Sequence, residues 1–404
     1  MKNNHKPEIR FPGYTGDWEQ RKLGDLADFS KGNGYSKSDL TDEGKPVILY
    51  GRLYTKYETV IESIDTFTIE KEKSVISKGN EVIVPASGET SEDISRASAV
   101  SKPGIILGGD LNIVRPSNEI DPVFLALTIS NGKQQKELSK RAQGKSVVHL
   151  HNSDLKEVNL LFPKKEEQTK IGNFFKKLDE TIALHQQELT TFKQTKQGFL
   201  QKMFPKEGES VPEVRFPEFT GDWEQRKLGE LVEIKSGWTP SDFVEAQKND
   251  GKIYIKVDDL NYSTREQLDS KMKVDIHTKY SIIKKGSTIF PKRGAAIMTN
   301  KVRILVNDGY MDTNMMALEP RDIDGEFLYT LIDRTGLYKI ADTSTIPQIN
   351  NKHIEPYKIL LPNLQEQKFI GGFFEKLDDI IALHQRELDA LKETKKAFLQ
   401  KMFV

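Results

Sequence analysis

The 404-residue chain contains two copies of one sequence frame, and this duplication constrains the fold more than any other feature. FPGYTGDWEQRKLGDL begins at Phe11 and FPEFTGDWEQRKLGEL begins at Phe216, a shift of 205 residues (216 − 11). IGNFFKKLDETIALHQQELTTFKQTKQGFLQKMF begins at Ile171 and its near-copy begins at Ile370, a shift of 199 residues (370 − 171). Because internal repeats mark duplicated structural units, we expect one domain, followed by one long element, to occur twice.

Between these frames the two halves differ in sequence, although their landmarks follow in the same order. Residues 112–116 correspond to residues 316–320, and each half closes with an apolar run and a proline, Pro163 and Pro362. The second interior is shorter by six residues (205 − 199). This pattern favours two similar domains that recognise different things. Neutral drift of two structural copies is the alternative, but drift would have eroded the frames as well.

A long helix is predicted after each interior. Residues 166–204 contain no proline, and apolar residues recur there at alternating spacings of four and three, as in a coiled coil. A helix of nearly 40 residues is about 57 Å long, and its exposed apolar face needs a partner, for which its own duplicate is the obvious choice. The predicted pairing residues are Leu178, Ile182, His185, Leu189, Phe192 and Phe199 in the first copy, and Leu377, Ile381, His384, Leu388, Leu391 and Phe398 in the second.

A duplication related by a pseudo-twofold axis predicts that these two helices run antiparallel, with a domain at each end. Lys196 and Lys395 fall in the same heptad frame as His185 and His384, which predicts polar layers that fix the register. Metal binding by the two histidines is disfavoured, because no cysteine, aspartate or second histidine stands at ligand spacing beside either. We predict no metal site.

Each interior reads as a series of short strands with a helix or two, which predicts the α/β (α+β) fold class. Asp121-Pro122 is expected to open a helix through Ser130. The predicted strands are Val47–Tyr50, Glu81–Val84, Leu111–Val114, Ile253–Val257, Thr288–Phe290 and Val302–Val306. The predicted order is a domain at 1–160, a long helix at 161–205, a linker at 206–215, a second domain at 216–360 and a second long helix at 361–404.

The loops between these strands carry side chains that suit DNA, since Arg and Lys pair with guanine, Asn and Gln pair with adenine, and hydroxyl groups bind phosphate. Any one such loop is more often a solvated turn, so the prediction rests on their number and placement. In the first domain the candidates are Ser36, Lys37, Arg52, Tyr54, Ser87, Glu89, Thr90, Lys145 and Ser146. In the second they are Trp238, Thr239, Ser241, Lys292, Arg293, Asn300, Lys301, Arg303, Asn314, Thr345 and Gln348.

The sequence shows no catalytic motif that survives inspection. Residues 144–146, Gly-Lys-Ser, lack the first glycine of a phosphate-binding loop, and residues 32–34, Gly-Asn-Gly, lack the third glycine of a dinucleotide fingerprint. Residues 130–133, Ser-x-x-Lys, lack the companion motifs of a serine nucleophile. No catalytic residue and no cofactor bound by this chain is therefore predicted.

Composition bounds the partners and the location. Lys plus Arg and Asp plus Glu both number 60, whereas an isolated DNA-binding domain usually has basic excess, so we expect other subunits to share the phosphate contacts. The chain has no cysteine, no run of about 20 apolar residues and no apolar segment after its first residues. We therefore expect a cytoplasmic protein that does not enter a membrane.

The duplicated frame resembles the specificity subunits of type I restriction-modification systems. The resemblance rests on W-x-x-x-x-L-G-(D/E)-L, from Trp18 and from Trp223, and on E-Q-x-x-I-(A/G)-x-F-F-x-x-L-D-x-x-I, from Glu167 and from Glu366. It covers essentially the whole chain. Within the interiors no family motif matches residue by residue, so the loop candidates come from their chemistry alone.

The resemblance implies that each variable domain reads one half of a split site in double-stranded DNA, and that the paired helices set the unspecified spacer. It also implies that two methyltransferase subunits dock on the helices and frames, and that two restriction subunits join for cleavage. S-adenosylmethionine, ATP and Mg²⁺ are then expected on those partner subunits. Two other classes stay open: a stand-alone bipartite DNA-binding regulator, and a scaffold whose variable domains bind two different proteins.

Overall fold

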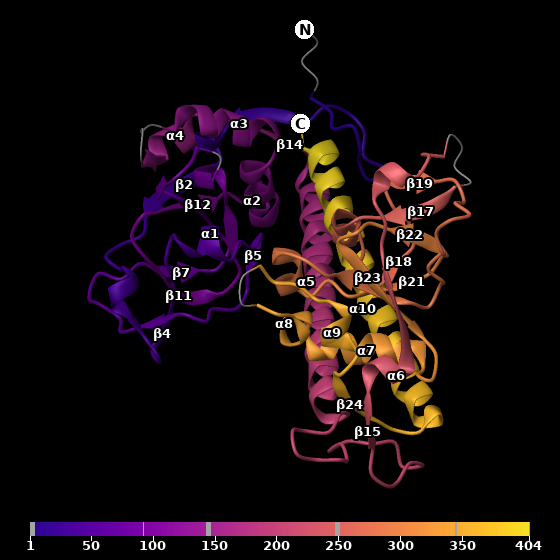
Figure 1. The fold of residues 1–404 in the computed structure, drawn as a ribbon. Helices are drawn as coiled ribbons and strands as arrows, with labels where there is room; N and C mark the ends of the chain where they lie inside the picture. The colour runs from indigo at the N-terminus through magenta and orange to yellow at the C-terminus, as the bar shows by residue number, and fades with distance from the viewer. Residues whose placement is uncertain (1–4, 92, 143–146, 247–250, 344–345, 404) are drawn as a thin grey trace. The chain divides into compact units, whose positions relative to one another are not determined.

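The computed structural model describes residues 5–91, 93–142, 147–246, 251–343 and 346–403. The chain forms two compact units (Figure 1): unit 1 comprises residues 1–187 with 386–404, and unit 2 comprises residues 188–385. The long helices are α5 (Lys165–Lys202) and α10 (Leu364–Met402). Each helix therefore begins in the unit of its own repeat and ends in the other unit. The two compact units therefore do not coincide with the consecutive domain and helix segments predicted from the sequence.

Each unit contains a five-stranded sheet of the same strand order. In unit 1 the order is β2 (Ala27–Lys31), β12 (Leu111–Pro116), β8 (Glu81–Pro85), β10 (Ser98–Val100) and β5 (Val60–Ile61). In unit 2 it is β16 (Val232–Ser236), β23 (Met315–Pro320), β20 (Thr288–Pro291), β21 (Arg303–Leu305) and β18 (Glu266–Gln267). In both sheets the last pair is parallel and the others are antiparallel. The interiors that differ in sequence thus share one topology.

A second sheet is also shared, with additions in unit 1. Its common part is β6 (Phe67–Thr68), β4 (Lys45–Ile48) and β11 (Pro103–Leu107), which matches β19 (Met272–Val274), β17 (Lys252–Ile255) and β22 (Gly309–Met311). Unit 1 adds β3 (Leu40–Thr41) and β7 (Ile76–Lys78). The remaining α-helices are α1 (Arg52–Thr55), α2 (Pro122–Ser130), α3 (Gly132–Arg141), α4 (Asn152–Lys156), α6 (Leu228–Leu231), α7 (Gly325–Thr335), α8 (Leu337–Ile340) and α9 (Asn351–Ile354).

The six predicted strands form, with ends shifted by up to two residues, and the helix predicted from Pro122 to Ser130 has these bounds. Asp121 starts it, because its Oδ1 accepts the backbone N–H groups of Val123 and Phe124. The predicted cap of the second long helix also forms, since Asn363 Oδ1 accepts the N–H of Glu366 at 3.0 Å. No helix among the described residues has the length and apolarity needed to cross a membrane.

The conserved frame joins each variable domain to its long helix. The first frame contributes β1 (Glu19–Lys22), which pairs with β14 (Asn159–Phe162), and the second contributes β15 (Glu224–Lys227), which pairs with β24 (Lys358–Leu361). Upstream of β1, Arg10 donates two hydrogen bonds to the buried Glu167 on α5, at 2.6 and 2.7 Å. Upstream of β15, Arg215 does the same with Glu366 on α10, at 2.8 Å for both. The Glu of the E-Q motif therefore serves the fold.

The Gln of that motif fastens the helix to the variable domain. Gln168 Oε1 accepts the N–H of Asp121 at 2.9 Å, and its Nε2 donates to Pro163 O at 2.8 Å. Gln367 makes the same two bonds in unit 2, with Asp324 and Pro362. Both glutamine side chains are buried, so an apolar replacement would leave these backbone groups unsatisfied.

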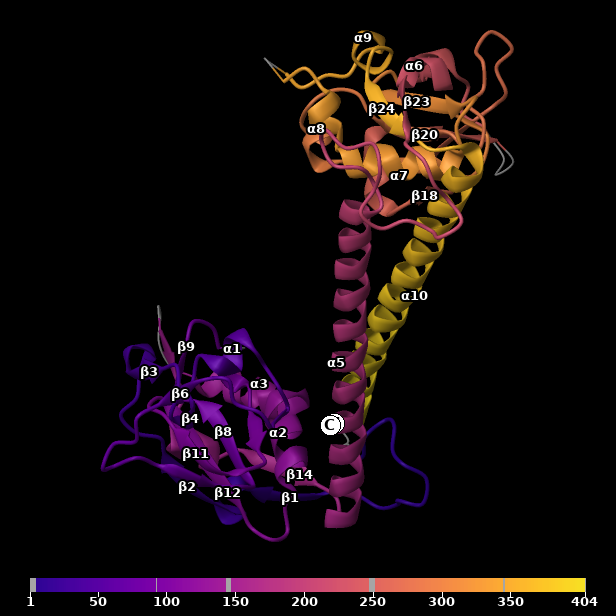
Figure 2. The same ribbon diagram turned by 90° about the horizontal axis from the view of Figure 1, so that it is seen from below.

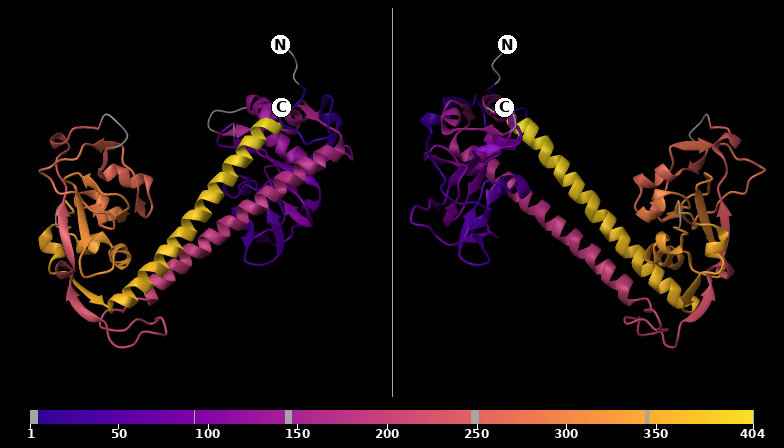
Figure 3. Two further views of the ribbon diagram at one scale, coloured as in Figure 1. Left: turned by 90° about the vertical axis from the view of Figure 1, so that its right-hand side faces the viewer. Right: turned by 60° about the vertical axis from the view of Figure 1, so that its left-hand side comes forward.

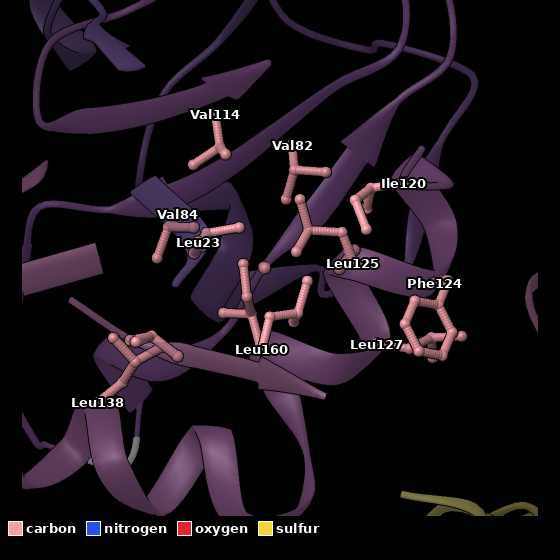
Figure 4. Close-up of a cluster of buried hydrophobic side chains, with 14 of the residues drawn as sticks. Leu23, Val82, Val84, Val114, Ile120, Phe124, Leu125, Leu127, Leu138 and Leu160 are labelled. Carbon is pink, nitrogen blue, oxygen red and sulfur yellow. The ribbon is translucent and has the colours of Figure 1, made fainter. Parts of the chain in front are cut away.

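The main core of unit 1 lies between α2, its five-stranded sheet and the frame, where side chains of β8, β12, β14 and α2 point toward one another (Figure 4). The end of α10 completes this core, since the Phe403 ring lies 5.9 Å from both the Phe124 and the Phe175 rings. In unit 2 the end of α5 has the same place, with the Phe204 ring 5.7 Å from that of Phe327 and 5.8 Å from that of Trp223. Each repeat therefore ends inside the core of the other.

Candidate nucleic-acid interface

Within each unit, the segments of the two long helices run antiparallel to each other (Figure 3), as predicted. In unit 1 the partner numbers fall as the α5 numbers rise: Phe174 packs on Phe398 at 5.1 Å, and Asp179 pairs with Lys395. In unit 2 the Phe199 ring likewise lies 5.1 Å from that of Phe373. All twelve predicted pairing residues are buried or half-buried, which is what a helix-to-helix interface requires: Leu178, Ile182, His185, Leu189, Phe192, Phe199, Leu377, Ile381, His384, Leu388, Leu391 and Phe398.

Charged pairs lie within this helix interface, and each occurs once in each unit. Lys196 Nζ lies 2.6 Å from Asp378 Oδ1 in unit 2, and Lys395 pairs with Asp179 at the equivalent place in unit 1. The histidines have weaker partners, with His185 Nδ1 3.8 Å from Glu387 and His384 Nδ1 3.7 Å from Glu188. Opposite charges held in a largely apolar interface penalise any other register. The lysines were identified from the sequence, but their aspartate partners were not.

Two loop candidates of the first domain, Arg52 and Tyr54, form hydrogen bonds inside that domain. Arg52 is almost buried, and its guanidinium donates to Asp65 Oδ1 at 2.5 Å, Glu58 Oε2 at 2.7 Å and Ser63 O at 2.9 Å. Tyr54 donates its hydroxyl to the carbonyl of Ser87 at 2.7 Å, and burial raises the pKa of Tyr54. These groups shape the domain, so we leave Arg52 and Tyr54 out of the interface proposed below.

Other first-domain candidates remain at the surface. Ser36 and Lys37 are exposed, although the Ser36 hydroxyl and backbone N–H both reach Asp39 Oδ2. Glu89 and Thr90 are exposed just after β9 (Ser87–Gly88), and the Thr90 hydroxyl donates to Asp93 at 2.8 Å. Lys145 and Ser146 lie outside the described residues, as does Thr345 of the second domain.

In the second domain three candidates have internal roles. Arg303 is buried, and its guanidinium donates to the carbonyls of Leu260, Ser263 and Val302. Burial lowers its pKa. Asn300 adopts a left-handed conformation (φ 48°) and bonds to Asp333, and Lys301 Nζ bonds to Asn261. The carbonyls around Arg303 would be left unpaired by its removal, so Arg303 and Asn300 support the fold.

Trp238 is half-buried at the edge of an aromatic cluster, with its ring 5.3 Å from that of Tyr280, while Thr239 and Ser241 beside it are exposed. Four candidates from distant parts of the sequence meet in unit 2. The N–H of Lys292 donates to Asn314 O at 2.7 Å, and Arg293 pairs across a β-bridge with Gln348. Burial lowers the pKa of Lys292, and the Arg293 charge lowers it further, so two cations stand close together here. These four residues are the only second-domain candidates joined by contacts that the described residues show.

The loop candidates thus divide into groups that hold the domains together and groups that remain exposed. The exposed set differs between the units in charge and in hydrogen-bonding chemistry, while the five-stranded sheets that contain β2 and β16 have the same strand order. His149, on β13 (Val148–His149), is not among the candidates predicted from the sequence, yet it is exposed and pairs with Ser87 of β9. Only the pairing of β13 with β9 brings these positions together, so no local signal could have found them.

The family model and two relatives that match this chain carry the same kind of description. The family model described as the type I restriction modification DNA specificity domain matches residues 15–194 and 220–393. The specificity subunit of type I restriction enzyme MjaVIII from Methanocaldococcus jannaschii is 23% identical over 402 residues, covering 95% of this chain and 91% of that protein. A putative MjaX specificity subunit from the same organism is 24% identical over 430 residues, covering 95% and 92%.

A similar fold is found in a crystal structure of the S subunit of a type I restriction-modification system from M. genitalium. It has a TM-score of 0.64 at 18% identity, and the similarity covers 99% of both chains. The shared fold therefore includes both variable domains and both long helices.

Proposed function

Because the chain belongs to the family of type I restriction-modification DNA specificity domains, we propose that it selects the DNA target of a type I restriction-modification complex. The observation that carries this is the double match: both repeats fit the family model, and each places a different set of exposed polar loops on the same pair of sheets. A scaffold conserved in topology but different in exposed chemistry suits two readers of two different sequences.

Each variable domain reads one half of a split target, and the helix pair sets the distance between the halves. The antiparallel contacts in each unit and the Lys–Asp pairs support a helix interface of fixed register. At 1.5 Å per residue, helices of 38 and 39 residues are long enough to place two readers about one turn of DNA, ~34 Å, apart.

The chain works with partner subunits that supply the chemistry. We propose two methyltransferase subunits, which carry S-adenosylmethionine, and two restriction subunits, which carry ATP and Mg²⁺, with this chain as the non-catalytic recognition subunit. Its equal numbers of basic and acidic residues support this arrangement, since a protein that supplied all the phosphate contacts alone would carry a net positive charge.

The test is to map methylated adenines across the genome of cells that express this chain with a cognate methyltransferase subunit, and of cells that lack only this chain. A split motif that appears only with the chain is expected. Methylation without any chain-dependent motif, by a demonstrably active methyltransferase, would refute the proposal and favour a protein-binding scaffold.

A domain exchange tests the modular part of the proposal. Residues 27–158 of the first interior are replaced by the corresponding interior of a relative with a known target, while both frames and both long helices are kept. The new motif is expected to change in one half-site and to keep the other half-site and the spacer. A change spread over the whole motif would show that the domains do not read independently.

A further inference from the structure

A short two-stranded ribbon occurs at the same place in both units. In unit 1 it is formed by residues 86–88 and 148–150, and in unit 2 by residues 292–294 and 347–349. In unit 2 Gln348 also exchanges two backbone hydrogen bonds with Asp342, at 2.9 and 3.0 Å, on the side away from Arg293. Strand β9 of the first ribbon can be found in Figure 2. The ribbons align at shifts of 206 residues for the first strand (292 − 86) and 199 for the second (348 − 149), so Ser87 corresponds to Arg293 and His149 to Gln348.

Two backbone hydrogen bonds of the first ribbon have equivalents of nearly the same length in the second. The N–H of Ala86 donates to Asp110 O at 2.7 Å, as the N–H of Lys292 donates to Asn314 O at 2.7 Å. The carbonyl of Ala86 accepts from Leu150 at 3.0 Å, and that of Lys292 accepts from Ile349 at 2.9 Å. The two domains have therefore kept the geometry of this ribbon while replacing the residues it presents.

The hydrogen-bond pattern fixes which side chains stand together. The N–H of Gly294 donates to Pro347 O at 2.8 Å and that of Ile349 to Lys292 O, so Arg293 and Gln348 form a non-hydrogen-bonded antiparallel pair. In such a pair the two side chains project from the same face, with their Cβ atoms about 5 Å apart. This separation is about one and a half times the ~3.4 Å rise between neighbouring base pairs, so the two long side chains can reach adjacent pairs. Ser87 and His149 are the equivalent pair in unit 1.

At least one buried side chain lies next to the paired position on the second strand of each ribbon. Val148 and Leu150 are buried on either side of the exposed His149, and Ile349 is buried beside Gln348. Arg293 is exposed, and among the described residues its guanidinium has no hydrogen-bond or ion-pair partner. An exposed arginine beside a second cation, Lys292, and opposite a glutamine amide is suited to an edge of bases rather than to the protein itself.

We propose that this ribbon is the base-reading element of each variable domain, and that its paired positions, Arg293 with Gln348 and Ser87 with His149, make the two half-sites different. The proposal rests on the proposed function. A two-stranded ribbon fits the major groove, where Arg pairs with guanine and Gln with adenine. The half-site of the second domain therefore contains a guanine next to an adenine. In the first domain Ser87 is buried, so the exposed His149 is the side chain of this pair that can reach the groove.

The experiment uses the full chain with its methyltransferase subunit and maps methylated motifs for Arg293→Ala, Gln348→Ala and Arg321→Ala. Arg321 is the control, because it is an exposed arginine of unit 2 that lies outside the ribbon and pairs with Glu233. Arg293→Ala is expected to lower discrimination at one base pair of one half-site by about 5- to 150-fold. Gln348→Ala does the same at the adjacent base pair, and Arg321→Ala leaves the motif unchanged.

The other half-site serves as an internal measure of folding and assembly, since it must still be read. An unchanged motif at uniformly lower methylation would overturn the proposal, because Arg293 would then contact only phosphate. If Arg293→Ala abolishes methylation, Arg293→Gln decides, because glutamine pairs with adenine and not with guanine: a changed preference at one base pair supports base reading, and an unchanged preference refutes it. His149→Ala must change the opposite half-site only. If the wild-type chain directs no split motif, the proposed function itself fails.

Discussion

The end of the second repeat should stabilise the first domain. Phe403 is 5% exposed and its ring packs on those of Phe124 and Phe175 in the core of unit 1. We therefore expect Phe403→Ala to destabilise unit 1, although the residue lies more than 200 positions away from that domain's own sequence. Phe204→Ala is the matched change at the end of the first repeat, and it should destabilise unit 2, where Phe204 packs on Trp223 and Phe327.

The expected size follows from the burial. Truncation of a buried phenylalanine costs about 3–5 kcal/mol, because the apolar contacts are lost and a cavity remains. With an m-value of about 3 kcal/mol/M in urea, the unfolding midpoint of the affected unit should fall by about 1–1.7 M. Such a loss is a large part of the stability of one domain.

The tryptophans give a separate signal for each unit. Trp18 lies in unit 1 with its ring 5.7 Å from that of Phe124, whereas Trp223 and Trp238 lie in unit 2. In a Trp223→Phe, Trp238→Phe background the fluorescence of Trp18 reports on unit 1, and in a Trp18→Phe background the other two report on unit 2. Each truncation is compared with its own background.

The control is Gln400→Ala, an exposed position on the last turn of α10, which should shift neither midpoint. The reasoning is refuted if Phe403→Ala lowers the unit 2 midpoint instead, or leaves the Trp18 transition in place. It is refuted equally if Phe204→Ala lowers the unit 1 midpoint and leaves the unit 2 midpoint in place.

Three further predictions concern the helix pair and one ion-pair cluster. Lys395→Asp should cost about 1–3 kcal/mol through loss of a charged hydrogen bond with Asp179, and the double variant Lys395→Asp, Asp179→Lys should regain most of it; additive effects in a double-mutant cycle would contradict the pairing. Seven residues inserted at the middle of both α5 and α10 add two turns and lengthen each helix by about 10 Å in total. The spacer of the methylated motif should then become longer while both half-sites stay the same, and an altered half-site would contradict the proposal that the helix pair sets the spacer. Hydrogen bonds from Lys56 and Arg52 lower the pKa of Asp65 to about 2, so this carboxylate should stabilise unit 1 above pH 3.8 and lose that effect as the pH falls toward 2. Asp65→Asn should therefore lower the free energy of unfolding by less than about 1 kcal/mol at pH 7, because the carboxylate is exposed, and by clearly less at pH 2, where the carboxylate is partly protonated; an equal loss at both pH values would exclude the ion pairs as its source.

The duplication, the two long helices and the antiparallel pairing of their apolar faces could all be predicted from the sequence. These follow from patterns that are local or repeated: the 3.5-residue period, the absence of proline and the near-identity of Ile171–Phe204 with Ile370–Phe403. The helix from Pro122 to Ser130 was also readable, because Asp121 caps it within three residues. Such features depend on neighbours in the sequence, which is why they needed no knowledge of the fold.

Whether a polar side chain bonds inside its domain or stays exposed could not be predicted from sequence patterns, because it depends on the tertiary structure. Arg52, Arg303 and Arg293 look alike in the sequence, yet the first two satisfy carboxylates and carbonyls inside their domains while the third is exposed. The partner of His149 is Ser87, 62 residues earlier (149 − 87), and it is set by strand pairing alone. The free energy of a polar group depends on the groups that folding brings within about 3 Å of it, and those partners come from distant parts of the chain.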